Sequence, residues 1–493
     1  MSNTLKDEFQ TRLDRLKKIR AAGVNPYPDS FNKKHKVAEI LELKSGTKNI
    51  KTAGRIMTLR VMGKIAFAHL QDDTGKIQLV FKLDELGKDV FKQLTQFFDL
   101  GDFIGVEGEV YTTQKGEHSV LVKTLQLLSK TLRPLPEKWH GLKDQEAMYR
   151  QRYLDLVTNR ETYERFIFRS EFLKQLRAFY EEQGFIEVET PILANTASGA
   201  LARPFTTHHN SLNTDVFLRI APETYLKECI IGGFEKVFEV ARCFRNEGMD
   251  PSHLQDFTMV EHYAAYWNFE DNMRFTEDLF AFLLKKLFGK LTIEIRDRKG
   301  KTMSVNFKAS WPRVSFRELI LRDAKIDIAK QNTAEKLARA IKAKKIAIDE
   351  LDSLGRGNMI DSLFKAVSRE KIIQPTFLVH HPLDLSPLAR RNDEDPSVVD
   401  RFQLIINTWE IVNAYSELVD PVDQYQRFEQ QSGSKVKGDT DAHGKDDEYV
   451  RALEHGAPPT SGWGMGVDRL VALLTQQDNL RDVVLFPLLK PEH

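Results

Sequence analysis

The sequence has little cysteine and no long apolar run, and both absences narrow the class of protein. Only two cysteines occur among 493 residues, Cys229 and Cys243, and their spacing fits neither a zinc site nor a disulfide framework. No apolar stretch has the length needed to span a bilayer. The first twenty residues mix acidic with basic side chains and lack the apolar segment of a secretory signal. We therefore expect a cytoplasmic protein in a reducing compartment.

A charge excess of either sign is also missing. The net charge is +1, which indicates no particular partner, because an RNA-binding protein can be nearly neutral overall when its basic residues are clustered. Apolar residues near the N-terminus recur at helical spacing, so this segment is either a helix that packs one apolar stripe or a helix that also contacts the RNA backbone. Its basic residues are Lys6, Arg12, Arg15, Lys17, Lys18 and Arg20.

The length of the chain predicts more than one domain. Residues 1–49 are expected to form an N-terminal helical extension, whose helix ends before Gly23. Five strand-like segments follow between residues 50 and 132, with one helical stretch, 84–98, after the third. This arrangement predicts a small OB-fold β-barrel, whose strand face commonly binds nucleic acid. A proline-containing linker over 133–160 comes next.

A different pattern occupies residues 161–493. Strand-like segments alternate with helices there, which predicts an α+β domain with an antiparallel sheet flanked by helices. It opens with a helix and a strand, FIEVETPIL (185–193), that Pro191 ends. Residues 322–372 look like an all-helical insertion. One face of the first helix is predicted to be apolar through Phe168, Phe172, Leu176 and Phe179.

The first candidate site surrounds Arg245. This arginine follows a strand, and its planar fork suits a phosphate or a carboxylate, while Glu247 can bind a neighbouring amine. Phe257, beyond a loop that contains His253, offers a flat face to a purine. The alternative is a strand-edge ion pair between Arg245 and Glu247, with Phe257 in the core.

The second candidate site is the segment GWGMGVDR, residues 462–469. Glycines at alternate positions leave one face of a strand without side chains, so a planar ligand or another backbone can approach closely. Arg469 then opens a helix, where it can meet phosphate charge and stack on a ring. The glycine spacing is not that of a dinucleotide site, and the alternative is close packing of the strand against the helix.

The third candidate site is a set of carboxylates and tyrosines. Alternate residues of a strand share a face, so Asn413, Tyr415 and Glu417 point one way, as do Glu261 and Tyr263. Carboxylates turned into a pocket need cations, so the set suits a ligand with ammonium groups beside a complex of Mg²⁺ with ATP. Any one of the glutamates taken alone could equally lie at the surface. The carboxylates of the set are Glu223, Glu261, Glu410 and Glu417.

Together these segments resemble the three signature motifs of the class II aminoacyl-tRNA synthetases. The first motif is the helix and strand before Pro191, the second is FRNEG (244–248) with Phe257, and the third is GWGMGVDR. The preceding barrel is similar to the anticodon-binding domain of the subclass for lysine, aspartate and asparagine. The segments GALARPF, APETYLK, NAYSEL and SPLARRND are most similar to the lysine-specific members. The resemblance covers essentially the whole chain.

The resemblance implies a role for each candidate residue. Arg245 would bind the α-phosphate and the amino-acid carboxylate, and Arg469 the γ-phosphate and the adenine; these two are the catalytic residues. Gly199 and Glu223 would bind the α-amino group of lysine. Glu417 and Tyr263, helped by Glu261, Asn413 and Tyr415, would bind the ε-ammonium. The implied ATP-binding set is Arg245, Glu247, His253, Phe257, Glu410 and Arg469. The implied lysine-binding set is Gly199, Glu223, Glu261, Tyr263, Asn413, Tyr415 and Glu417. The implied anticodon-binding set is Arg60, Phe67, His69, Gln78 and Glu117.

One position departs from the family pattern. Glu410 is the implied ligand of Mg²⁺, and the family usually has a second carboxylate seven residues earlier, where this chain has Gln403. An amide oxygen can ligate Mg²⁺ but brings no charge. We therefore expect weaker or rearranged metal binding at Gln403.

The activity implied by the resemblance is the ATP-dependent activation of L-lysine to lysyl-adenylate and its transfer to the 3′-end of tRNA(Lys) by a homodimer. A neutral amino acid of similar length should leave Glu417 buried and unpaired, which would favour lysine. Alternatives are a ligase that attaches lysine to a protein, a non-catalytic RNA-binding paralogue, and an aspartate or asparagine enzyme. The barrel argues against the first of these. The intact Arg245, Glu247 and Arg469 argue against the second, and Glu417 argues against the third.

Overall fold

The computed structural model describes residues 3–136, 144–196, 199, 202–297, 300–386, 388–436 and 446–491. The chain forms two compact units, Met1–Lys143 and Asp144–His493, and each is considered by itself. Residues 137–143 of the expected linker lie outside the described residues. Helices α5 (Gln145–Arg150) and α6 (Arg152–Thr158), which fall in the remainder of that stretch, belong to the second unit. Within the described ranges no helix is long and apolar enough to cross a membrane.

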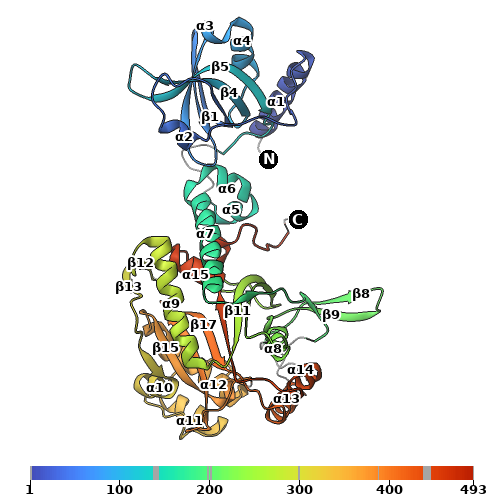
Figure 1. The fold of residues 1–493 in the computed structure, drawn as a ribbon, viewed down its shortest axis with the longest axis vertical. Coiled ribbons are helices and arrows are strands. Elements are labelled where there is room, and N and C mark those ends of the chain that lie inside the picture. The colour runs from blue at the N-terminus through green and yellow to red at the C-terminus, as the bar shows by residue number, and fades with distance from the viewer. Residues whose placement is uncertain are drawn as a thin grey trace. The chain divides into compact units, whose positions relative to one another are not determined.

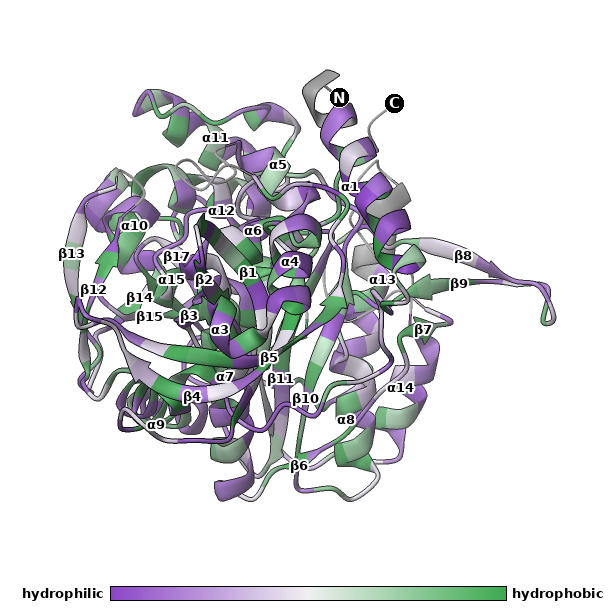
Figure 2. Ribbon diagram, turned by 90° about the horizontal axis from the view of Figure 1, so that it is seen from above, coloured by the Kyte–Doolittle hydropathy of each residue, from purple (hydrophilic) through white to green (hydrophobic). Residues whose placement is uncertain are grey.

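The first unit is built on a closed five-stranded barrel with the strand order β1-β2-β3-β5-β4. All neighbouring strands are antiparallel except β3 and β5. Each strand carries both hydrophobic and hydrophilic residues, as expected when one face packs on a core (Figure 2). The five-stranded barrel predicted from the sequence is thus confirmed. Its strands are β1 (Ile50–Met62), β2 (Ile65–Gln71), β3 (Lys76–Lys82), β4 (Phe103–Thr112) and β5 (His118–Ser129).

Four helices accompany the barrel: α1 (Asn3–Ala21), α2 (Val37–Leu41), α3 (Leu83–Leu86) and α4 (Lys88–Phe97). The helical stretch predicted after the third strand is two helices, because Gly87 takes a φ of +81° and breaks it. Helix α1 packs an apolar stripe, since Ile19 is fully buried in the barrel core. Lys17, Lys18 and Arg20 stay exposed, so contact with the RNA backbone remains a prediction for these residues.

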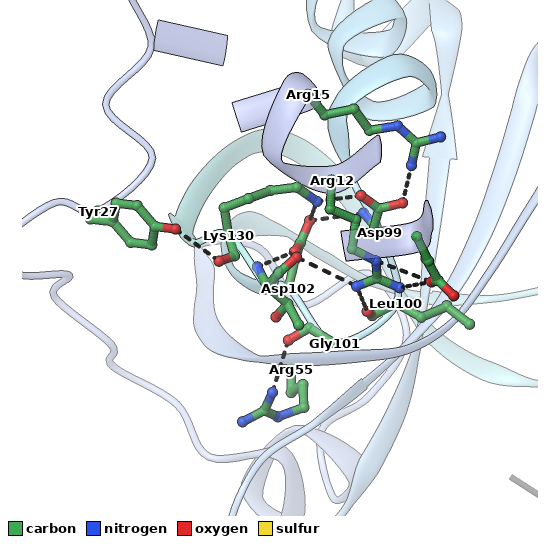
Figure 3. Close-up of polar contacts among 11 residues, drawn as sticks. Arg12, Arg15, Tyr27, Arg55, Asp99, Leu100, Gly101, Asp102 and Lys130 are labelled. Atoms are coloured by element: carbon green, nitrogen blue, oxygen red, sulfur yellow. Dashed lines mark hydrogen bonds and ion pairs between the residues drawn. The ribbon is translucent and has the colours of Figure 1, made fainter. Parts of the chain in front are cut away.

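A buried charge cluster joins α1 to the barrel (Figure 3). The side chain of Lys130 is fully buried and pairs with both Asp99 and Asp102. Asp102 also accepts hydrogen bonds from the backbone N–H groups of Asp99 and Thr131, at 2.8 and 2.7 Å. From α1, Arg12 donates to the carbonyl oxygen of Leu100 and Arg15 pairs with Asp99. Arg12 and Arg15, two of the basic residues noted in the sequence, therefore hold α1 against the barrel and do not form a basic surface for a ligand.

The second unit contains an eight-stranded sheet with the order β14-β15-β16-β17-β18-β11-β10-β6. Its pairs are antiparallel except β14 with β15 and β10 with β6. The mainly antiparallel sheet predicted for this region is thus confirmed. Its strands are β6 (Ile186–Glu187), β10 (Lys236–Phe244), β11 (Asp256–Ala265), β14 (Arg313–Ser315), β15 (Thr376–Pro382), β16 (Val398–Ile406), β17 (Trp409–Ser416) and β18 (Thr460–Gly466).

Two helices cover one face of this sheet, α7 (Arg160–Glu182) and α9 (Phe269–Phe288) (Figure 1). Phe172, Leu176 and Phe179 of α7 are buried in the shared core and Phe168 packs against it, as predicted. The core also contains α15 (Val467–Leu474), which follows β18 directly. The opposite face of the sheet is therefore left to carry a site.

Smaller elements complete the second unit. The strand predicted over 185–193 is wrong as a single strand: only the two-residue β6 and, after Pro191, the two-residue β7 (Leu193–Ala194) pair, and they join different sheets. Helices fill most of the predicted insertion. The remaining elements are β8 (Thr206–His209), β9 (Thr214–Leu218), β12 (Thr292–Arg296), β13 (Thr302–Asn306), α8 (Glu223–Ile231), α10 (Phe316–Ala324), α11 (Ala334–Ala343), α12 (Arg356–Val367), α13 (Pro421–Val436) and α14 (Asp447–Glu454).

Candidate active site

A cavity of about 390 Å³ lies over strands β11, β18 and β17. The register aligns Glu261 of β11 with Gly464 of β18, and Gly464 with Asn413 of β17. The next row on the same face is Tyr263, Gly462 and Tyr415. Helices α8 and α15 and the loop between β10 and β11 contribute further wall residues. Segments that are far apart in the sequence therefore build one pocket.

The glycines of β18 form the floor of this cavity. A Cβ on Gly462 would overlap the Glu417 carboxylate and the Tyr263 ring. A Cβ on Gly464 would lie 3.4 Å from Cγ of Glu261. The strand face without side chains predicted from the sequence is thus present, and it lets a ligand approach the backbone.

Arg245 stands in the part of the cavity formed by the β10–β11 loop. Its guanidinium lies over the ring of Phe257, 5.0 Å from the centroid. Its Nε is buried and has no hydrogen-bond partner in the described part of the chain, so an anion could accept this bond. Glu247 and His253 line the same part, and Nδ1 of His253 lies 2.7 Å from Asp250. Phe257 borders the cavity rather than the core, so the core alternative for it does not hold.

Arg469 supplies a second cation to the cavity. It lies in the first turn of α15, and its Nη1 donates to the carbonyl oxygen of Glu410 at 3.2 Å. Burial lowers the pKa of Arg469, and the neighbouring carboxylate of Glu410 opposes that effect. The preceding Asp468 pairs with Arg169 of α7 at 2.6 Å, which ties the start of α15 to the helix that covers the sheet.

Lys227, which lies outside the cavity wall beside its acidic part, is a cation that sequence reasoning missed. Nζ of Lys227 lies 2.6 Å from Oε1 of Glu223 and 2.5 Å from Oε2 of Glu417. The three residues are at most 5% exposed. Glu417 is not part of the cavity wall, but its carboxylate lies against Gly462, on the side where a Cβ would project. The expectation that a neutral amino acid would leave Glu417 unpaired is therefore wrong, because Lys227 pairs with it. The spacing of Glu223 and Lys227, one helical turn apart, was the available signal.

Glu261 is the carboxylate of this group that still lacks a partner. Its Oε2 is buried and accepts no hydrogen bond from the described residues. Burial raises the pKa of Glu261 well above its ordinary value, and the charge of Glu223 adds to the effect. Glu223 itself accepts a hydrogen bond of 2.6 Å from the hydroxyl of Tyr415. An ammonium group in the cavity would give Glu261 the partner that it lacks.

Asn413 is oriented by an arginine that the sequence did not single out. Nε of Arg401 donates to Oδ1 of Asn413 at 2.8 Å, and Arg401 also lines the cavity. Because arginine can only donate, the oxygen of the amide must face it, and the NH₂ group of Asn413 is the part that remains available as a donor. This geometry suits a carboxylate better than the ε-ammonium that the resemblance suggested for Asn413.

Gly199 completes the lysine-binding set inferred from the resemblance. Its φ is +89°, a conformation that favours glycine, and a Cβ there would lie 3.1 Å from Cβ of Glu223. Its backbone therefore borders the acidic part of the cavity. Residues 200 and 201, from the similar segment GALARPF, lie outside the described residues.

Only one of the two inferred metal ligands lines the cavity. Glu410 is in the wall, whereas Gln403 is not, and its Oε1 lies 3.2 Å from Nε2 of His381. A bulge between the two strands places Gln403 opposite Asn413 and Glu410 opposite Ile405. Over the described ranges, no group of three His, Cys, Asp or Glu side chains could hold a metal ion.

The five residues inferred to contact the anticodon lie on the outer face of the barrel. Ala66 and Ala68 of β2 are buried in the core, and Phe67 between them is half-buried on the other side. The register places Arg60 opposite Phe67 and Gln78 opposite His69. A hydrogen-bond network links the remaining side chains: Gln78 donates to Glu117 at 2.6 Å, and His69 lies 3.3 Å from Glu117. The core alternative for Phe67 therefore does not hold.

Comparison with known proteins indicates the same family as the sequence motifs. Residues 144–490 match the family model for tRNA synthetases class II (D, K and N), and residues 50–128 match the OB-fold nucleic acid binding domain. The lysine–tRNA ligase of Thermosipho africanus is 45% identical over 99% of this chain and 97% of that protein. Those of Carboxydothermus hydrogenoformans and Lactococcus lactis are 44% identical, each over 99% of both chains. The cavity, the barrel and these relatives together identify the chain as a member of the lysine–tRNA ligase family of class II tRNA synthetases.

Proposed function

We propose that the chain activates L-lysine with ATP and transfers the lysyl group to tRNA(Lys). The observation that carries this proposal is the charge distribution of one cavity, in which Arg245 and Arg469 line one part and Glu223 and Glu261 line another. A triphosphate and a diamino acid together match this distribution. The identity of about 45% to lysine–tRNA ligases supports it.

In the first step an oxygen of the lysine carboxylate attacks the α-phosphorus of ATP as the bond to pyrophosphate breaks. The carboxylate is already ionised, so no general base is required. Arg245, with an unpartnered Nε beside the cavity, binds the carboxylate and the α-phosphate, and Arg469 binds the triphosphate tail. The free NH₂ of Asn413 donates to the same carboxylate. Catalysis is then positioning and charge neutralisation.

Mg²⁺ is the implied metal, and the residues present fit one mode of binding it. Mg²⁺ is commonly held by one or two carboxylates together with substrate phosphates. Glu410 lines the cavity beside Arg469 and can serve as that carboxylate. When bound, the ion would neutralise charge on the phosphates. Gln403 lies outside the cavity wall, next to His381, so the proposal assigns it no direct metal bond.

In the second step the 3′-hydroxyl of the terminal adenosine of tRNA(Lys) attacks the carbonyl carbon of lysyl-adenylate. An ester bond to the tRNA forms as the bond to the phosphate breaks, and AMP and a proton are released. The outer face of the barrel, with Phe67 and His69, is proposed to read the unstacked anticodon bases by stacking and edge hydrogen bonds. The enzyme is proposed to act in the cytoplasm, where its three substrates occur.

A homodimer is proposed on the same family grounds. Exposed apolar residues of α7 and of the segment around Pro191 support it, because a patch of this kind commonly marks a contact between proteins. These residues are Ile167, Ile186, Ile192 and Leu193, which are 45–55% exposed. Sedimentation of the purified chain at micromolar concentration measures the state directly, and a monomer would contradict this part of the proposal.

The test is amino-acid-dependent exchange of labelled pyrophosphate into ATP, followed by charging of tRNA. We expect exchange with lysine, none with aspartate or asparagine, and charging of tRNA(Lys). Exchange with aspartate or asparagine would indicate a different amino-acid specificity. Lysine-dependent exchange without tRNA charging would favour a ligase that modifies a protein, and absence of all exchange would favour a non-catalytic RNA-binding protein.

A further inference from the structure

Lys227 is a buried charged residue that the proposed chemistry does not use. It lies on α8, one helical turn after Glu223, and is 4% exposed. Its Nζ bridges Glu223 and Glu417 at 2.6 and 2.5 Å. It is not part of the cavity wall, so it stands behind the residues that would meet a ligand.

The surroundings of Lys227 are built for an ammonium group. Nζ lies 5.4–5.8 Å from the ring centroids of Tyr263, Tyr415 and Tyr449, so aromatic faces as well as two carboxylates surround the charge. An ammonium held by carboxylates and tyrosine rings is the same chemistry that the proposed substrate would need. The protein thus carries one lysine ammonium of its own beside the place for another.

The buried charges around Lys227 do not balance without a ligand. Glu223, Glu261 and Glu417 are three buried carboxylates, and Lys227 is the cation within pairing distance of two of them. When all are ionised, the group has two negative charges left. A diamino acid brings two ammonium groups, so it neutralises this remainder, whereas a monoamino acid leaves one charge buried without a partner.

We propose, on the basis of the function proposed above, that Lys227 is a positioning residue that selects a diamino acid. Its ammonium fixes Glu223 and Glu417 in place. It also leaves the pocket with two net negative charges, which two ligand ammonium groups can balance. It does not touch the substrate, so its effect reaches the substrate through the two carboxylates.

The titration of Glu417 supports this role. Burial raises the pKa of Glu417, Lys227 opposes that shift and Glu223 adds to it, with a result of about 8. The other titratable groups close to the Lys227 ammonium are Tyr263, Tyr415 and Tyr449. A substrate ammonium favours the ionised form of Glu417, so lysine must displace a proton when the pH is below this pKa. kcat/KM for lysine should therefore rise up to about pH 8 and level off above it. Without Lys227, the pH at which kcat/KM levels off (the break in the pH profile) should be higher.

The main experiment replaces Lys227 by methionine, which has a similar length and no charge. We expect KM for lysine in pyrophosphate exchange to rise about tenfold or more, because Glu417 and Glu223 lose a shared counter-ion. KM for ATP should change less than about twofold, and the break in the pH profile should move up by about one unit. Lys130→Met, which removes the buried lysine of the barrel, and Lys285→Met at an exposed position of α9, are matched controls that should keep the parental KM for lysine.

A second variant separates positioning from folding. Lys227→Ala leaves a space that propylammonium can fill, since that ion reproduces the missing atoms. Added propylammonium should restore the melting temperature and lower KM for lysine in this variant alone. Recovery of stability without recovery of lysine affinity would show a structural counter-ion only and overturn the proposal.

The outcomes also distinguish this inference from the function on which it rests. If the parental chain shows no lysine-dependent exchange, the proposed function fails. If the parental chain exchanges and Lys227→Met keeps both its KM for lysine and its pH break, the assignment of Lys227 is wrong and the proposed function stands.

Discussion

Each of the two units buries a lysine between two carboxylates, and the two clusters differ in what surrounds them. In the barrel, Lys130 pairs with Asp99 and Asp102, and backbone N–H groups satisfy Asp102 (Figure 3). In the second unit, Lys227 pairs with Glu223 and Glu417 beside a cavity of about 390 Å³. A buried ionic cluster by itself therefore does not mark a site.

Polar atoms without a partner make the difference. In the described residues of the barrel cluster, no buried side-chain nitrogen or oxygen atom lacks a hydrogen bond. In the second unit, Nε of Arg245 and Oε2 of Glu261 are buried without one, and both residues line the cavity. An orphan donor and an orphan acceptor cost free energy in an empty site and are satisfied by a ligand. The first cluster is thus complete by itself, and the second is complete only with a bound molecule.

The largest effect is expected for Arg245→Ala, which removes the orphan donor. The rate of pyrophosphate exchange should fall by a factor that corresponds to roughly 3–4 kcal/mol, as for a lost oxyanion donor. The melting temperature should stay close to that of the parent, because the Nε of Arg245 makes no hydrogen bond within the described residues. Exchange near the parental rate would show that Arg245 has no role in the reaction.

Lys130→Met tests the complete cluster. Removal of this cation leaves the buried carboxylate of Asp102 without its counter-ion, while Asp99 keeps Arg15, so the barrel should lose roughly 3 kcal/mol of its free energy of unfolding. Burial already raises the pKa of Asp102, although Lys130 opposes that shift, so protonation of Asp102 limits the loss. Denaturant unfolding of the full chain measures the change, while lysine-dependent exchange should persist. A variant with unaltered stability and impaired exchange would show that the Lys130 cluster serves activity rather than stability, contrary to the comparison.

Phe67→Ala tests whether the barrel has a ligand surface of its own, outside the complete cluster. Loss of one stacking ring should weaken tRNA binding by about 1–3 kcal/mol. Aminoacylation should become slower at limiting tRNA, whereas pyrophosphate exchange without tRNA should not change. If exchange and charging fell together, Phe67 would be needed for folding rather than for the anticodon.

The smallest effect is expected for Gln403→Glu, which restores the carboxylate that relatives of this chain are expected to have. The variant should need only slightly less Mg²⁺ for half-maximal exchange, because the added carboxylate would act through its charge and not as a direct metal ligand. Since Gln403 lies outside the cavity wall beside His381, an unchanged Mg²⁺ profile would show that this position takes no part in metal binding.

Local patterns predicted the elements of the fold well. Strands with one buried face, such as β2 with Ala66, Ala68 and Leu70 in the core, are visible as alternation in the sequence. The strand predicted over 185–193 failed because pairing partners decide whether an extended segment joins a sheet, and only Ile186–Glu187 finds one in the large sheet. Gly87 ended a helix that hydrophobic spacing alone would have continued.

The site was predictable where side chains act directly on a ligand and was missed where they act on one another. Arg245 and Arg469 belong to motifs that sequence alone picks out. Lys227 and Arg401 do not, because their importance comes from contacts with Glu417 and Asn413, far away in the sequence. The position of Gln403 depended on a bulge between two strands, which no spacing rule provides.

The most direct test of the account compares lysine with norleucine, which has the same carbon chain but no side-chain ammonium, in pyrophosphate exchange by the parental chain. The unpartnered carboxylate of Glu261 predicts a ratio of kcat/KM on the order of 10⁴ in favour of lysine, as expected for a site built to bond a group that the analogue lacks. A ratio below about ten would contradict the account, because the buried carboxylates would then not select for a second ammonium group.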